Sequence, residues 1–139
     1  MISYASIQKR LARKAQQPQR ATESAEQRAV IEWANRQTNV YPELALLFHI
    51  PNGGKRPGRT AAMLKREGVK AGVPDLQLCC ARHGHHGLFI EMKAERGRLS
   101  EAQAAIIVQL RAAGYMVAVC FGQDEAKTTI CAYLGIKTP

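Results

Sequence analysis

The segment Lys70–Gly97 reads KAGVPDLQLCCARHGHHGLFIEMKAERG, and it contains two short apolar runs joined by a polar turn. The runs DLQLCCA and GLFIEMK have the length, composition and flanking turn residues of two adjacent β-strands. Three charged residues interrupt this pattern, because Asp75 opens the first run, Glu91 lies inside the second and Lys93 follows it closely. Isolated charges beside a sheet core are costly, so these positions call for a specific explanation.

Side chains alternate between the two faces of a strand, which predicts that Glu91 and Lys93 share a face. If the two runs are neighbouring strands, Asp75 lies alongside Glu91. Two carboxylates there suit a hard cation, Mg²⁺ or Mn²⁺, that takes oxygen ligands and keeps several waters. Such an ion would polarise a phosphodiester and activate a water. Lys93 would then hold or deprotonate the water and offset charge in the transition state.

A structural interpretation of the same residues stays open. Asp75 could cap the turn that follows residues 72–74, and Glu91 and Lys93 could form an internal ion pair at a strand end. The spacing D-x15-E-x-K is a loose pattern. Spacing alone therefore does not decide between a catalytic and a structural role.

The rest of the chain alternates helical and strand patterns. Helices are predicted at 21–37, with Thr22 as the cap, at 59–67, at 99–113 and at 123–134; further strands are predicted at 43–50 and 115–121. The helix at 99–113 is expected to bury the stripe of Leu99, Gln103, Ile106 and Leu110. The order α-β-α-β-β-α-β-α predicts an α/β fold with a central mixed β-sheet of about four strands flanked by α-helices.

Length and composition exclude several classes of protein. With 139 residues, 46% of them hydrophobic, the chain suits one compact domain at 21–139 behind a basic N-terminal arm at 1–20. Its apolar runs are far shorter than the roughly 20 residues of a membrane span, and the start lacks the pattern of a secretory signal. The cysteines, Cys79, Cys80, Cys120 and Cys131, form no C-x-x-C pair and are expected as buried free thiols. We therefore expect no membrane partner and a cytoplasmic location.

The net charge of +9 favours a polyanionic partner, either nucleic acid or an acidic membrane surface. The arm at 1–20 carries cations without any acid, and could track DNA, support a dimer or be a plain tail. A second basic stretch surrounds the loop NGGKRPGR, whose glycines permit a close backbone approach to phosphates. The candidate DNA contacts here are Lys55, Arg56, Arg59, Lys65 and Lys70. The alternative is a solvated basic surface.

Four segments of the chain together resemble a known nuclease family, and they read HIPNGGKR, LKREGVKAGVPDLQL, LFIEMKAERGRLSEAQ and GYMVAVCFG. The family is the VRR-NUC domain, a branch of the PD-(D/E)xK nuclease superfamily, in its small stand-alone form of phages and bacteria. The resemblance runs from about Thr22 to Phe121. It implies a restriction-endonuclease-like core and an Mg²⁺- or Mn²⁺-dependent endodeoxyribonuclease in a bacterial or phage-infected cell. Hydrolysis would use an activated water without a covalent intermediate.

The resemblance also implies roles for single residues. Asp75 and Glu91 look like the metal-binding acids, Lys93 looks like the catalytic lysine, and the backbone carbonyl of Met92 is a further expected ligand. An acid on the first helix normally completes such a site. Glu23 matches best, since it shares a helical face with Gln27, and Glu26 is a close rival.

Gln103 interrupts the apolar stripe of its helix, and the family match places it near the acids. The alternative is that Ser100 and Gln103 form an S-x-x-Q capping box at the start of that helix. Asn52 and Tyr115 also lie in matching segments, where they could contact substrate or shape the site. The cluster HGHH at 83–86 lacks a thiolate or fourth ligand at finger spacing, and is interpreted as a polar turn rather than a zinc site. His49, at the end of a predicted strand, is interpreted as a packed or turn residue.

Stand-alone members of the family resemble junction-cleaving enzymes, so branched DNA such as a four-way (Holliday) junction is the expected substrate. Cutting two opposed strands of a two-fold-symmetric junction calls for two active sites, which a homodimer supplies. The main alternative is a non-catalytic basic DNA-binding accessory protein whose acids are structural. A sequence-specific restriction nuclease is disfavoured, because a chain of this length has no evident target-recognition domain.

Overall fold

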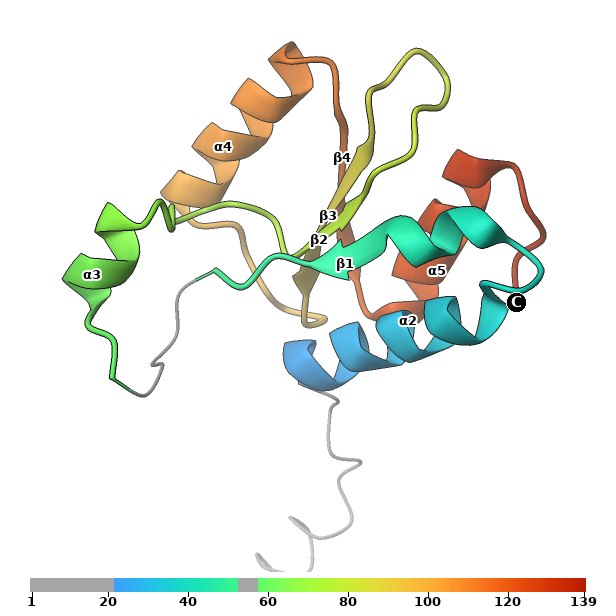
Figure 1. The fold of residues 1–139 in the computed structure, drawn as a ribbon, viewed down its shortest axis with the longest axis horizontal. Coiled ribbons are helices and arrows are strands. Elements are labelled where there is room, and N and C mark those ends of the chain that lie inside the picture. The colour runs from blue at the N-terminus through green and yellow to red at the C-terminus, as the bar shows by residue number, and fades with distance from the viewer. Residues whose placement is uncertain (1–21, 53–57) are drawn as a thin grey trace, which may run out of the picture.

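The computed structural model describes residues 22–52 and 58–139 (Figure 1). The arm at 1–20 and the candidate contacts Lys55 and Arg56 therefore lie outside the described residues. In chain order the elements are α2 (Glu23–Gln37), the 3-10 helix η1 (Pro42–Leu46), β1 (Leu47–His49), α3 (Ala61–Arg66), β2 (Leu76–Leu78), β3 (Leu88–Lys93), α4 (Glu101–Ala112), β4 (Met116–Phe121) and α5 (Gln123–Leu134).

The four strands of the described residues form one mixed sheet, as predicted, and their order in it is β1-β2-β3-β4. The pairs β1/β2 and β2/β3 are antiparallel, and β3/β4 is parallel. Leu76 pairs with Ile90, so continuing that register by one residue sets Asp75 opposite Glu91. The hairpin between β2 and β3 therefore brings the two predicted acids to one end of the sheet.

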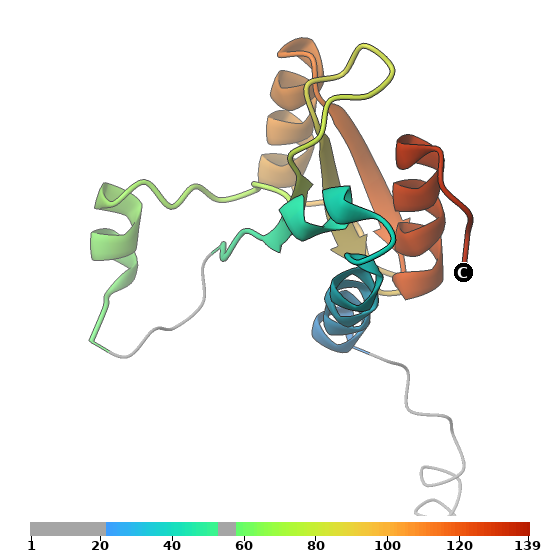
Figure 2. The same ribbon diagram turned by 45° about the vertical axis from the view of Figure 1, so that its right-hand side comes forward.

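Helices cover both faces of the sheet (Figures 1 and 2). The larger core lies between the sheet and the pair α2 and α5, and includes Val30, Trp33, Ile90, Met92 and Ile130. On the opposite face, α4 packs Ile107 against Phe89 and Val117. Alternation along β3 accordingly directs Met92 to the α2 and α5 side, and Glu91 and Lys93 to the α4 side.

Local signals set the start of several helices. Thr22 caps α2, because its Oγ1 accepts a hydrogen bond from the N–H of Ala25 at 3.1 Å. Thr60 caps α3 in the same way through the N–H of Met63. The helix α3 lies away from the sheet, on the long connection between β1 and β2 (Figure 2). None of the helices in the described part of the chain is long and apolar enough to span a membrane.

The prediction of one strand at 43–50 was wrong. Residues 42–46 form η1, and β1 contains only the three residues that follow. A proline at the first positions of a helix is favourable because its φ is already set and its missing N–H costs nothing there. A continuous apolar run is compatible with either a buried helix or a strand, so the sequence pattern did not distinguish them.

Two burial predictions were also wrong. Leu99 precedes α4 and is 39% exposed, because the helix begins only after Ser100, and its buried stripe is centred on Ile107 instead. All four cysteines are free thiols as expected, but Cys79 is exposed, since it lies just beyond the end of β2. The turn at 82–86 is a polar hairpin, as predicted, with Arg82 bridged to His85.

Candidate active site

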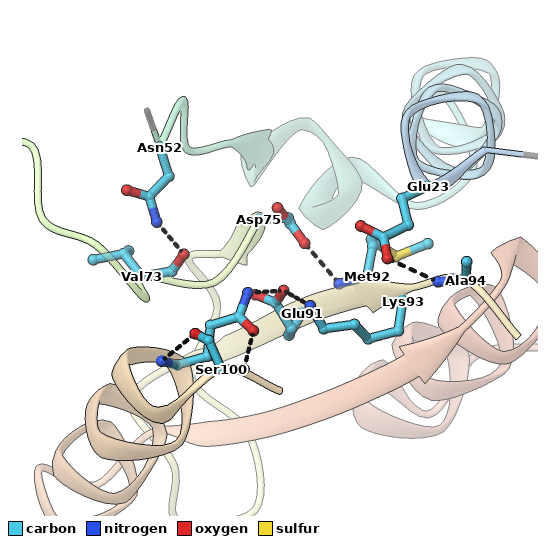
Figure 3. Close-up of polar contacts among 10 residues, drawn as sticks. Glu23, Asn52, Val73, Asp75, Glu91, Met92, Lys93, Ala94 and Ser100 are labelled. Carbon is cyan, nitrogen blue, oxygen red and sulfur yellow. Dashed lines mark hydrogen bonds and ion pairs between the residues drawn. The ribbon is translucent and has the colours of Figure 1, made fainter. Parts of the chain in front are cut away.

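Asp75 lies at one end of the sheet, one residue before β2 (Figure 3). Its Oδ2 accepts a hydrogen bond of 2.7 Å from the backbone N–H of Met92 in β3. This bond closes the end of the β2/β3 ladder with a side chain in place of a backbone carbonyl. The carboxylate is thereby held across the strand from Glu91.

Glu91 and Lys93 share the α4 face of β3, as alternation predicted. Their side chains are only 3% and 9% exposed, and Lys93 Nζ lies 3.2 Å from Glu91 Oε1. The amide Nε2 of Gln103 donates to the same oxygen at 2.6 Å (Figure 3). One carboxylate oxygen therefore receives both an ammonium and an amide donor, which fixes the orientation of the carboxylate.

Gln103 fulfils both roles that the sequence offered as alternatives. Its Oε1 accepts from the N–H of Ser100 at 2.9 Å, and Ser100 Oγ accepts from the N–H of Gln103 at 3.2 Å. This is a complete capping box at the start of α4. Because the amide oxygen is committed to the cap, the amide nitrogen is turned toward Glu91.

The two candidate acids at the start of α2 have different surroundings. Glu23 Oε1 accepts a hydrogen bond of 3.1 Å from the N–H of Ala94, directly after Lys93 (Figure 3). The carboxylate of Glu26 instead accepts from the N–H of Gln123 at the start of α5. Glu23 is therefore the acid next to Lys93, whereas Glu26 links α2 to the N-terminus of α5.

Neighbouring acids and burial destabilise the charged carboxylates. Burial and then the charge of Asp75 raise the pKa of Glu91 to about 7, although Lys93 opposes that shift. Burial also raises the pKa of Asp75, while the hydrogen bond from Met92 and the proximity of His49 lower it. The charge of Glu23 contributes to raising both pKa values. An added cation at this point would relieve the repulsion.

The donors at this point fit a hard divalent cation. Among residues 22–52 and 58–139, no three or more His, Cys, Asp or Glu side chains are grouped to hold a metal, and this includes the HGHH turn. An ion would therefore depend on the carboxylates of Asp75 and Glu91, a backbone carbonyl and water. The N–H of Met92 faces Asp75, and within a strand the carbonyl of the same residue faces the same edge. Mg²⁺ commonly binds through one or two carboxylates and retained waters.

The loop that carries Asp75 is held from two sides. Gly72 has φ +88°, and a Cβ on it would lie 2.4 Å from the backbone oxygen of Ala102 in the first turn of α4. Asn52 Nδ2 donates to the carbonyl of Val73 at 2.7 Å (Figure 3). In the sequence, Gly72 indicates only a turn before Asp75. The contact with Ala102 is long-range, and no local signal predicted it.

A basic cavity of about 940 Å³ is lined in part by Gln103, whose amide contacts Glu91. It is lined by four of the predicted DNA contacts, Asn52, Arg59, Lys65 and Lys70. Arg59 is paired with Glu67, and no acid is among the lining residues in the described part of the chain. The structure thus gathers these predicted contacts around one hollow next to the acids.

Two further residues lie differently from what the sequence suggested. Tyr115 packs its ring 5.2 Å from that of Phe89, at the end of β4 opposite to the acids, so it contributes to packing. His49, interpreted from sequence as a packed or turn residue, has its Nδ1 2.8 Å from the backbone oxygen of Asp75. Its position at the end of a strand that pairs with β2 was the available signal.

Comparison with known proteins gives a consistent family. The family model described as the VRR-NUC domain matches residues 5–124. A solved structure described as a VRR_NUC domain protein shares 34% sequence identity, covers 84% of this chain and 91% of its own, and superposes with a TM-score of 0.71. The search of curated proteins gave no match.

Replacing Asp75 with asparagine should remove the charge repulsion with Glu91 while keeping the hydrogen bond from Met92. In chelator at about pH 8, above the pKa of Glu91 of about 7, the variant should be at least as heat-stable as the parent, because the amide oxygen can still accept from Met92. Added Mg²⁺ should raise the melting temperature of the parent and of the Glu32→Gln control, which removes an exposed acid of α2. An equal Mg²⁺ shift in Asp75→Asn would exclude this aspartate as a ligand.

Gly72→Ala should destabilise the protein more than Gly84→Ala. Both glycines have positive φ, but a Cβ at Gly84 has nothing within 4 Å, whereas one at Gly72 meets backbone atoms of α4. The difference in free energy of unfolding, measured by denaturant titration, should be about 1–3 kcal/mol, as expected for overpacking. Equal losses in the two variants would show that the contact with Ala102 is dispensable.

Proposed function

The chain belongs to the VRR-NUC domain family, and from this premise we propose that it is a metal-dependent DNA endonuclease. Membership makes it a nuclease-type protein that interacts with DNA. The proposal of metal-dependent endonuclease activity rests on one observation. Asp75 and Glu91 face each other at the end of the sheet, and Glu91 Oε1 contacts both Lys93 and Gln103. This arrangement brings two metal-binding groups, a proton-transfer group and an orienting amide to one point.

The chemistry is divided between the side chains and the cation that they would hold. When bound by Asp75, Glu91 and the carbonyl of Met92, Mg²⁺ or Mn²⁺ would supply the charge that polarises the phosphodiester and lowers the pKa of water. Lys93 would orient the attacking water and offset negative charge as the phosphorus becomes five-coordinate. Water adds to phosphorus while the bond to one ester oxygen breaks, leaving a phosphomonoester and a hydroxyl.

The remaining residues orient these groups. Gln103 fixes the Glu91 carboxylate from the first turn of α4, and Glu23 accepts from Ala94 beside Lys93. We assign Glu23, rather than Glu26, as the first-helix acid, because the carboxylate of Glu26 accepts from the N-terminus of α5. Lys65 and Lys70 would bind backbone phosphates in the basic cavity.

We also propose that the favoured substrate is branched DNA and that the active form is a homodimer. The support is the resemblance to stand-alone family members, together with a symmetry argument. A four-way junction offers two equivalent strands, and each protomer would cut one of them.

Substitution at the acids should abolish cleavage but leave DNA binding intact. With Mg²⁺ or Mn²⁺ on duplex, single-stranded and four-way-junction DNA, Asp75→Asn, Glu91→Gln and Lys93→Met should each lose at least about 100-fold in rate, since each removes a metal ligand or charge-stabilising group. Glu32→Gln should cleave like the parent, because this acid is exposed on α2. Chelator should stop all cutting.

If the parent binds all three DNA forms but cuts none of them with either metal, the protein is instead a DNA-binding accessory protein. Such a protein would still show a steep dependence of affinity on salt concentration.

The dimer proposal predicts paired cuts in a four-way junction. Sedimentation at micromolar concentration should give twice the chain mass, and product analysis should show nicks in two opposed strands. A monomeric mass, or cleavage of one strand only, would exclude the dimer and leave the cleavage proposal in place.

A further inference from the structure

A second cavity is lined in part by Lys93, whose ammonium contacts Glu91. Its volume is about 350 Å³, and it is lined by the turn after β3 and the end of β4. Its charged and aromatic lining residues are Glu26, Lys93, Glu95, Arg96 and Phe121.

Phe121 presents an aromatic ring at this cavity. It pairs with Lys93 in the parallel β3/β4 register, so the two side chains extend from the same face of the sheet. Phe121 is nevertheless 46% exposed, although the other residues on that face of β4, Val117 and Val119, pack into the α4 cluster. The packing of the domain leaves this ring uncovered, on the strand next to Lys93.

Arg96 is brought to the same cavity by a tight turn. Gly97 N–H donates to the carbonyl of Ala94 at 2.8 Å, and a Cβ on Gly97 would lie 3.1 Å from the Cδ of Lys93. The turn is therefore packed against the aliphatic part of Lys93, and the exposed Arg96 within it lines the cavity with Phe121.

The two cavities differ in charge. The larger one has the cations Arg59, Lys65 and Lys70, and no acid among its described lining residues. Among its described lining residues, the smaller one has the acids Glu26 and Glu95 and the cations Lys93 and Arg96, in equal number. A phosphate would be favoured in the first and opposed by two carboxylates in the second. A neutral group with a flat face suits the second.

One lining residue of each cavity contacts the same carboxylate oxygen of the candidate site. Gln103 lines the larger cavity and Lys93 lines the smaller, and both contact Glu91 Oε1, at 2.6 and 3.2 Å. A DNA strand with its scissile phosphate at Glu91 would have its backbone on one side and one flanking nucleotide on the other. Inside a duplex the face of that base is stacked on its neighbours and cannot reach a protein ring.

We propose that Phe121 and Arg96 form a subsite for an unpaired nucleobase that flanks the scissile phosphate. Phe121 stacks on the face of the base, and the guanidinium of Arg96 packs against the same base. The inference rests on the proposed nuclease function and narrows its substrate class to DNA strands with an unstacked nucleotide at the cut. Aromatic stacking is tolerant of sequence, so the subsite selects structure rather than base identity.

A double-mutant cycle on binding tests this subsite. Binding is measured in the Asp75→Asn background, which keeps the DNA intact, with oligonucleotides that carry an abasic nucleotide at each position around the cleavage point. Phe121→Ala should weaken binding to the strand with an unpaired base by about 5-fold to 100-fold. Phe121→Tyr should restore it. Phe48→Ala is the matched control, because Phe48 is 45% exposed at β1, on the opposite edge of the sheet.

The effects of Phe121→Ala and of one abasic position should not add, because both remove the same contact. Full additivity at every position, or an equal loss in Phe48→Ala, would overturn the subsite. Failure of the proposed function is seen separately, as an absence of metal-dependent cleavage by the parent chain, since the cycle measures binding alone.

Discussion

The burial of Glu91 on the α4 face of β3 is the constraint on which the rest of the site depends. A carboxylate that is 2% exposed and faces a second acid is unfavourable unless its charge is compensated. Lys93 and Gln103 supply part of that compensation through one oxygen. Three carboxylates, Glu23, Asp75 and Glu91, nevertheless lie near this one ammonium. The local charge is therefore negative in a protein whose net charge is +9. A phosphate could approach such a point only with a cation, which is the physical reason for proposing a metal there.

The first turn of α4 connects the elements that carry the two acids. Its capping box fixes the Gln103 amide that contacts Glu91, and the backbone of Ala102 leaves room only for a glycine at position 72, three residues before Asp75. A displacement of this turn would therefore move both acids relative to one another. The capping box also explains why a polar residue interrupts the apolar stripe of α4. The same side chain caps the start of the helix and orients a group of the site, so one residue satisfies a local and a long-range requirement.

Local geometry accounts for what the sequence could predict. Alternation along a strand requires Glu91 and Lys93 to share a face, and a short polar turn between two apolar runs brings Asp75 back beside them. The caps at Thr22 and Ser100 are equally local. The choice between Glu23 and Glu26 could not be made from local geometry, because both project from neighbouring positions of one helix. Only the contacts with Ala94 and Gln123, distant in the chain, distinguish them. The strand at 43–50 failed for a related reason, since an apolar run specifies burial but not the backbone conformation that achieves it.

The two cavities near Glu91 differ in charge. This difference would serve two separate requirements of a nuclease that acts on branched DNA. Contacts with phosphates supply affinity that is the same for any sequence or structure, and the basic cavity beside α3 is suited to that role. Discrimination between duplex and branched DNA must come from a group that is inaccessible in a stacked helix, and a base face is such a group. Phe121 lies uncovered at the end of the strand that pairs with β3, where a balanced set of charges gives no preference to phosphate. On the proposed function, DNA structure would thus be distinguished by residues of the same sheet that carries Asp75 and Glu91.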